Sequence, residues 1–170
     1  MASDFAELER GAAAVYGDVS GVWAMILFGR PTKPDMLLAR PALAAMSKRA
    51  PRGFATLTWV LPEAGLSMDE DARKAAAGVT SEFGAAIRAQ ATLIELGGFQ
   101  GATVRAIVAG LDMMSRSSCP KRTFGNLAPA LEWCVTHRED PSVTPAVDAM
   151  CRTLEGVRAS LRTTGRAGRA

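Results

Sequence analysis

The chain of 170 residues is poor in the side chains that usually carry catalysis or bind metals. It contains one histidine, His137, and three cysteines, Cys119, Cys134 and Cys151, with no Cys-x-x-Cys spacing. An odd number of cysteines argues against a disulfide framework, and their spacing argues against a structural zinc site. We therefore expect no metal, no cofactor and no disulfide, which is typical of a reducing, cytoplasmic environment.

Long hydrophobic runs are also missing. The longest strictly apolar run covers residues 22–28 only, far short of the roughly 20 residues that span a bilayer. The first ten residues, Met-Ala-Ser-Asp-Phe-Ala-Glu-Leu-Glu-Arg, are too acidic and too polar for a secretory signal. The sequence therefore predicts neither a transmembrane segment nor a signal peptide.

An excess of positive charge is present only at the C-terminal end. The net charge of +3 includes +4 from residues 152–170, which hold five arginines against Glu155, so the remainder is −1 by subtraction. A basic field over the whole surface, which is typical of nucleic-acid-binding proteins, is absent, and we expect no specific nucleic-acid partner. Residues 163–170 contain Gly165 and Gly168 and are predicted to form a disordered, solvated basic tail.

Residues 91–111 hold the clearest structural pattern in the chain. A short apolar run ends at Gly97-Gly98 and is typical of a buried strand. After the glycines the apolar residues recur on one face of a helix: Val104, Ile107, Val108, Leu111 and Met114. A buried strand, a glycine turn and an amphipathic helix form half of a βαβ unit, which indicates a parallel sheet covered by helices.

Similar units extend this pattern along residues 12–137. Strands are predicted at residues 12–16, 22–28, 54–61, 91–96 and 121–124, the first two joined as an antiparallel hairpin. Helices are predicted at residues 35–48 (kinked or restarted at Pro41), from a cap at Ser67 or Asp69 to residue 87, from the glycine turn after residue 97 to about residue 115, and at residues 127–136. Residues 1–11 are expected to be a frayed or short helical lead-in. The predicted fold is α/β, with a mixed, mostly parallel five-stranded sheet flanked by helices.

A separate amphipathic helix is predicted at residues 144–162, after a polar break at residues 137–142. Its apolar residues repeat at intervals of three and four: Val147, Met150, Leu154, Val157 and Leu161. A seam of this kind does not stay exposed to water. It either pairs with the same helix of a second copy, giving a homodimer, or packs on its own domain.

Three segments carry a resemblance to a known family. They are Gly21-Val-Trp followed by Gly29-Arg-Pro-Thr, residues 97–111, and Phe124-Gly-Asn-Leu-Ala-Pro-Ala-Leu-Glu-Trp133. Over residues 12–137 the chain resembles the STAS-like fold of bacterial anti-sigma-factor antagonists and their SEC14-like relatives, in particular a myxobacterial branch. The resemblance implies a regulatory protein-interaction module. Phosphorylated antagonists carry an Asp-Ser-Ser-Gly turn, whereas here Ser67 precedes Asp69, Glu70 and Asp71, which would repel a phosphate.

The loops after the parallel strands are the expected place for any ligand, because such sheets bind ligands at the carboxyl ends of their strands. Glu63 lies in this region, and the predicted lining residues are Arg30, Thr32, Lys33, Ser67, Phe99 and Asn126. Arg30 and Lys33 would favour an anionic head group. Residues 97–101 lack the lysine and the glycine spacing of phosphate-binding loops, so a tight turn is the favoured interpretation.

The sequence favours a non-enzymatic function. It has no Gly-x-Ser-x-Gly elbow and no clustered carboxylates, and His137 is predicted at a solvent-facing helix end. We expect a bacterial regulatory or scaffolding module that binds a protein partner and self-associates. The first alternative is a carrier or sensor of a small apolar or anionic, lipid-like ligand in the strand-end crevice. The second alternative is a small hydrolase or transferase.

Overall fold

A computed structural model describes the chain except for residues 1–3, 66, 116, 140–144 and 168–170. Its centre is a six-stranded sheet in which the strands follow one another in sequence order. The strands are β1 Phe5–Arg10, β2 Ala14–Val19, β3 Val22–Leu27, β4 Phe54–Val60, β5 Ile87–Ile94 and β6 Lys121–Phe124. β1, β2 and β3 are antiparallel, and β3 to β6 are parallel. The predicted mixed α/β sheet is confirmed, with one strand more than expected.

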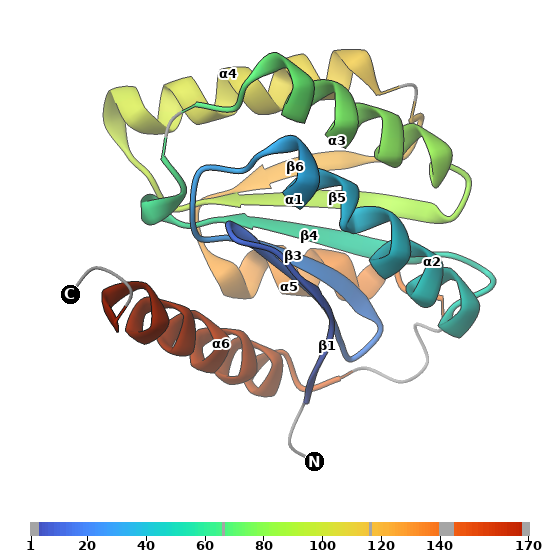
Figure 1. The fold of residues 1–170 in the computed structure, drawn as a ribbon. Coiled ribbons are helices and arrows are strands. Elements are labelled where there is room, and N and C mark those ends of the chain that lie inside the picture. The colour runs from blue at the N-terminus through green and yellow to red at the C-terminus, as the bar shows by residue number, and fades with distance from the viewer. Residues whose placement is uncertain (1–3, 66, 116, 140–144, 168–170) are drawn as a thin grey trace.

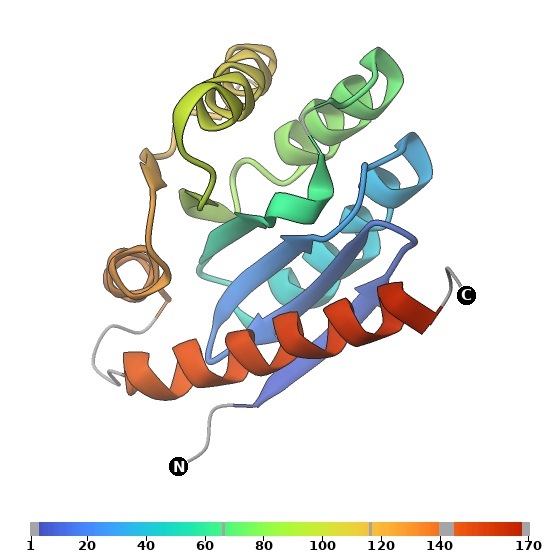
Figure 2. The same ribbon diagram turned by 90° about the vertical axis from the view of Figure 1, so that its left-hand side faces the viewer.

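The helices form a layer on each side of the sheet (Figures 1 and 2). One layer holds α1 Lys33–Leu37, α2 Ala39–Arg49, α3 Glu70–Glu82 and α4 Gly98–Met114; the other holds α5 Leu127–Thr136 and α6 Val147–Ala167. A short 3-10 turn, Pro62–Ala64, follows β4. The crossovers from β3 to β4, β5 and β6 all step in one direction, so a constant hand of connection places α1 to α4 on one face.

The N-terminal segment is a strand and not the predicted frayed or helical lead-in. β1 pairs with β2 at the edge of the sheet. The Phe5 ring occupies the space over Gly17, where a Cβ atom would overlap it, and Leu8 packs on the layer of α1 to α4. An edge strand of this kind keeps charged residues at its solvent positions, and this alternation is why its sequence looks too polar for a strand.

The hairpin between β2 and β3 is confirmed, but β2 continues to Val19, beyond the predicted end at residue 16. The chain reverses at Ser20 and Gly21, which have φ values of 50° and 82°. Both positive angles suit a tight two-residue hairpin turn. The Asp18 carboxylate accepts a hydrogen bond of 2.8 Å from the Gly21 N–H. Gly17 lies inside the strand because the Phe5 ring requires a residue without a side chain there.

Two predicted helices have different limits. The helix predicted at residues 35–48 is two helices, α1 and α2, and Pro41 lies in the first turn of α2, where its missing N–H is tolerated. α3 begins with Asp69 as its N-cap, whose carboxylate accepts a bond of 2.7 Å from the Ala72 N–H. It ends at Glu82, and Ile87, predicted as helical, is the first residue of β5. α4, β6 and α5 lie within one residue of their predicted limits.

The C-terminal helix packs on its own domain. Met150, Leu154 and Leu161 are buried in the core with β2, β3, β4 and α5, and Val147 and Val157 are partly buried against the same core. Of the two alternatives for this seam, packing within the chain is the one in the structure, so a homodimer would need another surface. α6 continues to Ala167, past the predicted end at residue 162 and into the predicted disordered tail.

Candidate functional site

The most distinctive feature of the α1–α4 side is a cavity of about 160 Å3 between the sheet, α3 and α4. Its walls are mostly apolar. α4 contributes Val104, Ile107, Val108 and Leu111, and α3 contributes Ala76, Ala77 and Val79. These residues cover one inward-facing side of each helix. The side chains on α3 are small, so they leave space between this helix and the sheet that larger side chains would fill.

The floor of the cavity is polar, although it belongs to the middle of the sheet. Thr56 and Thr58 of β4 lie beside Gln90 and Thr92 of β5, in the pairs Thr56–Gln90 and Thr58–Thr92. All four side chains line the cavity. Central strands of parallel sheets are normally apolar on both faces because helices cover them. This two-by-two patch of hydroxyl and amide groups is therefore an exception that packing does not explain.

Most of these polar groups have no partner within the protein. The Thr56 hydroxyl donates to the Ala89 carbonyl at 3.4 Å. The side chains of Thr58, Gln90 and Thr92 make no hydrogen bond to another residue in the described part of the chain, and they remain only partly buried. Trp23 also lines the cavity, and its indole Nε1 is buried without a partner there. Enclosed polar groups require water or a ligand to satisfy them.

A charged pair closes the end of the cavity near the C-terminus of α4. The Lys121 ammonium lies 3.2 Å from the Asp112 carboxylate and donates to the Ser115 hydroxyl at 3.1 Å. Asp112 and Ser115 line the cavity. Lys121 extends the polar row of the floor, since it is paired with Gln90 across β5 and β6. The Lys121–Asp112 ion pair joins α4 to β6.

The other end of α4 is fixed by glycines. Gly98 has a φ of 59°, which favours glycine, and turns the chain from β5 into the helix. A Cβ atom at Gly101 would overlap the carbonyl of Leu96, so the first turn of α4 approaches the strand end very closely. Because both ends of α4 are fixed, its middle covers the cavity on the side opposite the sheet. We call this side the roof of the cavity. The glycines predicted to form a tight turn therefore place this helix.

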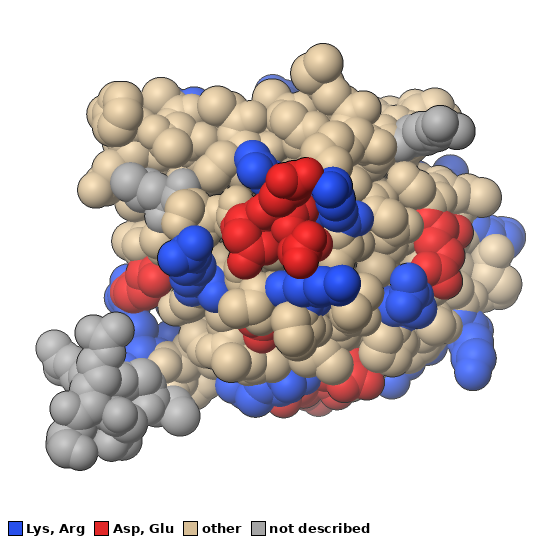
Figure 3. Space-filling model, turned by 45° about the horizontal axis from the view of Figure 1, so that its top comes forward, with Lys and Arg blue, Asp and Glu red and all other residues tan. Residues whose placement is uncertain are grey.

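The residues predicted to line the strand-end crevice do not form one site. Ser67 lines the cavity. Thr32 and Lys33 line a separate, shallow hollow with Asp69, Glu70 and Asp71. The remaining positions are exposed and line neither the cavity nor this hollow: Arg30, Phe99 and Asn126. Figure 3 shows acidic and basic groups close together over the middle of this face, so the predicted basic surface for an anionic head group is largely offset by acids.

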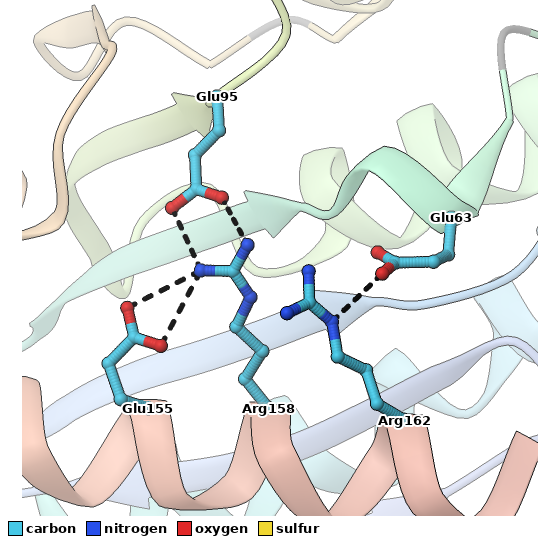
Figure 4. A network of polar contacts seen from close by, with 5 residues as sticks. All are labelled: Glu63, Glu95, Glu155, Arg158 and Arg162. Carbon is cyan, nitrogen blue, oxygen red and sulfur yellow. Dashed lines mark hydrogen bonds and ion pairs between the residues drawn. The ribbon is translucent and has the colours of Figure 1, made fainter.

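Two glutamates at the strand ends are bound by arginines of α6 (Figure 4). Arg158 lies 2.7 Å from Glu95, which follows β5, and Arg162 lies 2.9 Å from Glu63, which follows β4. Arg158 also contacts Glu155 at 3.4 Å, and its guanidinium lies 5.2 Å from the Trp59 ring centre. These two arginines fasten α6 across the strand ends, and both belong to the helix predicted at residues 144–162.

The remaining titratable candidates are structural. His137 Nδ1 lies 2.8 Å from the Trp133 carbonyl, and its ring lies against the Trp133 ring at 4.5 Å. Burial raises the pKa of the Cys134 thiol to about 12, so this cysteine stays protonated at neutral pH. Asp35 is 3% exposed. Burial raises the pKa of Asp35, but hydrogen bonds from Thr32 and Ala13 outweigh that effect and lower the pKa overall.

Metal binding and membrane insertion find no support in the described residues. They contain no group of three or more histidine, cysteine, aspartate or glutamate side chains arranged to hold a metal ion. Among them no helix has the length and apolar character needed to cross a membrane. The expected cytoplasmic location stays a prediction.

The sequence did hold a signal for the cavity floor. β4 reads Phe-Ala-Thr-Leu-Thr-Trp-Val and β5 reads Ile-Arg-Ala-Gln-Ala-Thr-Leu-Ile, so β4 carries polar residues at two alternate positions and β5 at three. Alternate residues of a strand share a face. Polar residues at matching positions of neighbouring buried strands indicate a polar patch beneath the helices. The overall apolar character of β4 hid this pattern.

The chain shows no match to any protein-family model, to any curated protein or to any solved structure. The resemblance to STAS-like proteins therefore stays a prediction, and the function has to be argued from the cavity and the surfaces around it.

Proposed function

We propose that this protein binds a small molecule in the cavity beneath α4, as a carrier or sensor. The observation that carries the proposal is the set of partly exposed, unpartnered side chains of Thr58, Gln90 and Thr92 on central strands. Polar groups in such a place cost stability unless something binds them. A protein that only needed a stable core would have valine or isoleucine there. Ligand binding was the first alternative in the sequence analysis. We now assign it to the cavity beneath α4 and not to the strand-end crevice.

Binding is favoured over catalysis by the state of the polar residues. The Lys121 ammonium is already engaged by the protein, in an ion pair with Asp112 and a hydrogen bond to the Ser115 hydroxyl. The floor supplies hydroxyl and amide groups, which orient a ligand through hydrogen bonds and do not transfer protons at neutral pH. We therefore propose no residues for a hydrolase or transferase activity.

The proposal is tested by filling the cavity. Val108 lines the cavity, and Ala106 lies on the outer surface of the same helix. A library of ligands with the size of a single ring is screened by ligand-observed NMR against the wild type, Val108→Phe and Ala106→Phe. We expect ligands for the wild type and for Ala106→Phe, and their loss in Val108→Phe. A second filling variant, Ala76→Leu, covers the case in which Val108→Phe does not fold.

Either of two results would count against the binder. One is that no compound binds the wild type at millimolar concentration. The other is that Val108→Phe and Ala76→Leu, both folded, bind the same compounds as the wild type.

A second candidate function is self-association through the outer face of α4. Phe99 is 84% exposed and Met113 is 88% exposed. Ala102, Ala106 and Ala109 lie between them at intervals of four and three, and all three are exposed. An antiparallel pair of α4 helices related by a two-fold axis near Ala106 would place Phe99 against Met113 at both ends. The small residues in the middle would permit close approach of the helices, so we propose a second copy as the partner of this face.

Self-association is tested by the mass in solution. Light scattering of the wild type is expected to give twice the monomer mass, and Phe99→Ser with Met113→Ser is expected to give the monomer. The control is Leu161→Ser on α6, which should lower stability without changing the mass at a temperature where the protein is folded. A monomeric wild type at high protein concentration rules out this interface, and it leaves the cavity proposal untouched.

A further inference from the structure

We infer that the ligand of the cavity is a neutral molecule about the size of one ring, with an apolar body and one hydroxyl or similar hydrogen-bonding group. This inference rests on the proposed function, because it names the chemical class of the molecule that would fill the same cavity. Three properties of the cavity carry it: its volume, its charge and the opposite character of its floor and roof.

The volume limits the ligand to a few heavy atoms. The cavity measures about 160 Å3, close to the roughly 150 Å3 of an engineered apolar cavity that binds benzene in another protein. Sites for drug-sized molecules are larger, at roughly 300–1,000 Å3. A two-chain lipid does not fit in this space, so the lipid-like ligand considered from the sequence is replaced by a much smaller one.

The charge of the lining favours a neutral ligand. Among the lining residues that the structure describes, Asp112 is the one charged side chain, and Lys121 lies 3.2 Å from its carboxylate. A carboxylate in the cavity would lie near Asp112 without a cation of its own. An ammonium would compete with Lys121 for the same carboxylate. Burying an unpaired charge is costly, whereas a neutral polar group is not penalised when it forms a hydrogen bond.

The floor and the roof of the cavity recognise different parts of one molecule. Thr58 and Thr92 lie side by side on the floor, and a threonine hydroxyl both donates and accepts hydrogen bonds. Ile107, Val108 and Leu111 form the roof and offer only apolar contacts. A ring with a hydroxyl on one side satisfies both surfaces, with the hydroxyl toward the sheet and the ring toward α4.

The test compares three ligands of similar shape: p-cresol, toluene and 4-methylbenzoate. Their dissociation constants are measured by NMR titration at pH 7 against the wild type. p-Cresol is expected to bind about tenfold more tightly than toluene, which corresponds to one well-formed hydrogen bond. 4-Methylbenzoate is expected to bind most weakly, because its carboxylate has no free cation in the cavity.

The floor residues are tested by substitutions that keep their shape. In Thr58→Val with Thr92→Val, the advantage of p-cresol over toluene is expected to fall below about twofold, because valine replaces each hydroxyl with a methyl group. Toluene itself should bind at least as well as before. The matched control is Thr103→Val on α4, whose hydroxyl bonds to the Phe99 carbonyl outside the cavity; it should keep the wild-type preference.

The possible failures are distinguishable. If toluene binds as tightly as p-cresol, or if 4-methylbenzoate binds most tightly, the inferred class is wrong and the cavity remains a binding site. If none of the three binds, the inferred class is overturned, and the library screen against the wild type decides the proposed function separately. The wild-type titrations decide the class alone if the double valine variant does not fold.

Discussion

The helices on the two faces of the sheet pack against it in different ways. On one face α6 buries Met150, Leu154 and Leu161 completely or nearly so, and its arginines bind glutamates at the strand ends. On the other face α4 has an equally regular apolar pattern, yet its inward residues line a cavity. Its outward residues Phe99 and Met113 remain exposed. The difference lies in the side chains that the sheet presents to each helix.

The chemistry of the sheet explains this difference. Toward α5 and α6 the central strands present Ala55, Leu57 and Trp59, and the core on that side is apolar and closed. Toward α3 and α4 the same strand presents Thr56 and Thr58. A single strand therefore has one apolar face in a closed core and one partly polar face at the cavity where we propose binding. In a protein of this size, a cavity with polar groups is a cost to folding that binding can offset.

The largest contrast is expected from matched leucine truncations on the two faces. Leu154→Ala on α6 removes a fully buried side chain and should lower the free energy of unfolding by about 3–5 kcal/mol. Leu111→Ala on α4 removes a partly buried side chain that already faces a cavity, and should cost about 1 kcal/mol. Urea unfolding measures both. Equal losses would mean that α4 is packed as tightly as α6.

The next effect concerns Asp35, which anchors the start of α1. Its carboxylate accepts bonds from the Ala13 N–H at 3.1 Å and from the Thr32 N–H and hydroxyl at 3.0 and 2.6 Å. Asp35→Ala should lower the free energy of unfolding by about 2–4 kcal/mol at pH 7, because the buried Ala13 N–H and the two partly buried Thr32 donors lose their acceptor. Asp35→Asn, which keeps one carbonyl oxygen, should cost less.

The same residue predicts a pH dependence. The pKa of Asp35 is lower in the folded state than its ordinary value. Its stabilising contribution is therefore fully present above the unfolded pKa of about 3.9 and is lost as the pH falls through the lower folded pKa. Between pH 6 and pH 3 the wild type should lose more stability than Asp35→Asn. Parallel curves for the two proteins would contradict this assignment.

A smaller effect separates the two arginines of α6. Arg158 is mostly buried between Glu95 and Glu155, whereas the side chain of Arg162 is half exposed. Arg158→Met should cost about 1–2 kcal/mol of unfolding free energy, because it leaves the partly buried Glu95 without its cation. Arg162→Met should cost about 0.5 kcal/mol or less. A double-mutant cycle of Arg158 with Glu95 measures the pair itself, and a coupling near zero would show that the pair does not hold α6.

The smallest effect distinguishes the two threonines of β4. Thr58→Val should leave stability unchanged or raise it by about 0.5 kcal/mol, because the hydroxyl has no partner in the described protein. Thr56→Val removes the bond to the Ala89 carbonyl and should lower stability by about 0.5–1 kcal/mol. Thermal unfolding at matched conditions compares them. A clear loss of stability in Thr58→Val would argue that its hydroxyl serves the fold and not a ligand.

The sequence predicted elements with strong local patterns and missed features that depend on distant residues. α5 and the start of α3 followed from capping residues and apolar spacing, and both were predicted correctly. β1 was missed because its polar outward residues hide the strand, and its place depends on Gly17 of the neighbouring strand. Of the residues predicted to line the crevice, Ser67 alone lines the cavity where we propose binding. Rules for strand ends led to Arg30 and Asn126, whereas the cavity depends on how far α4 stays from the sheet.

The partners of charged residues were the least predictable part. No pattern in residues 152–170 points to Glu95 or Glu63 as the partners of Arg158 and Arg162. Such pairs join positions far apart in the chain, and only the packing of α6 across the sheet brings them together. The cavity floor was partly predictable. Its alternating polar residues are visible in the sequence, but their enclosure beneath α4 is not.

The measurement that tests the central claim most directly is a crystal structure determined under xenon pressure. Xenon enters apolar cavities that are large enough to hold it. The account predicts a xenon site between α4 and the sheet, against Val108 and Leu111, and none within the core beneath α6. A structure in which α4 lies directly on β4 and β5, with no xenon and no ordered water over Thr58 and Thr92, would contradict it.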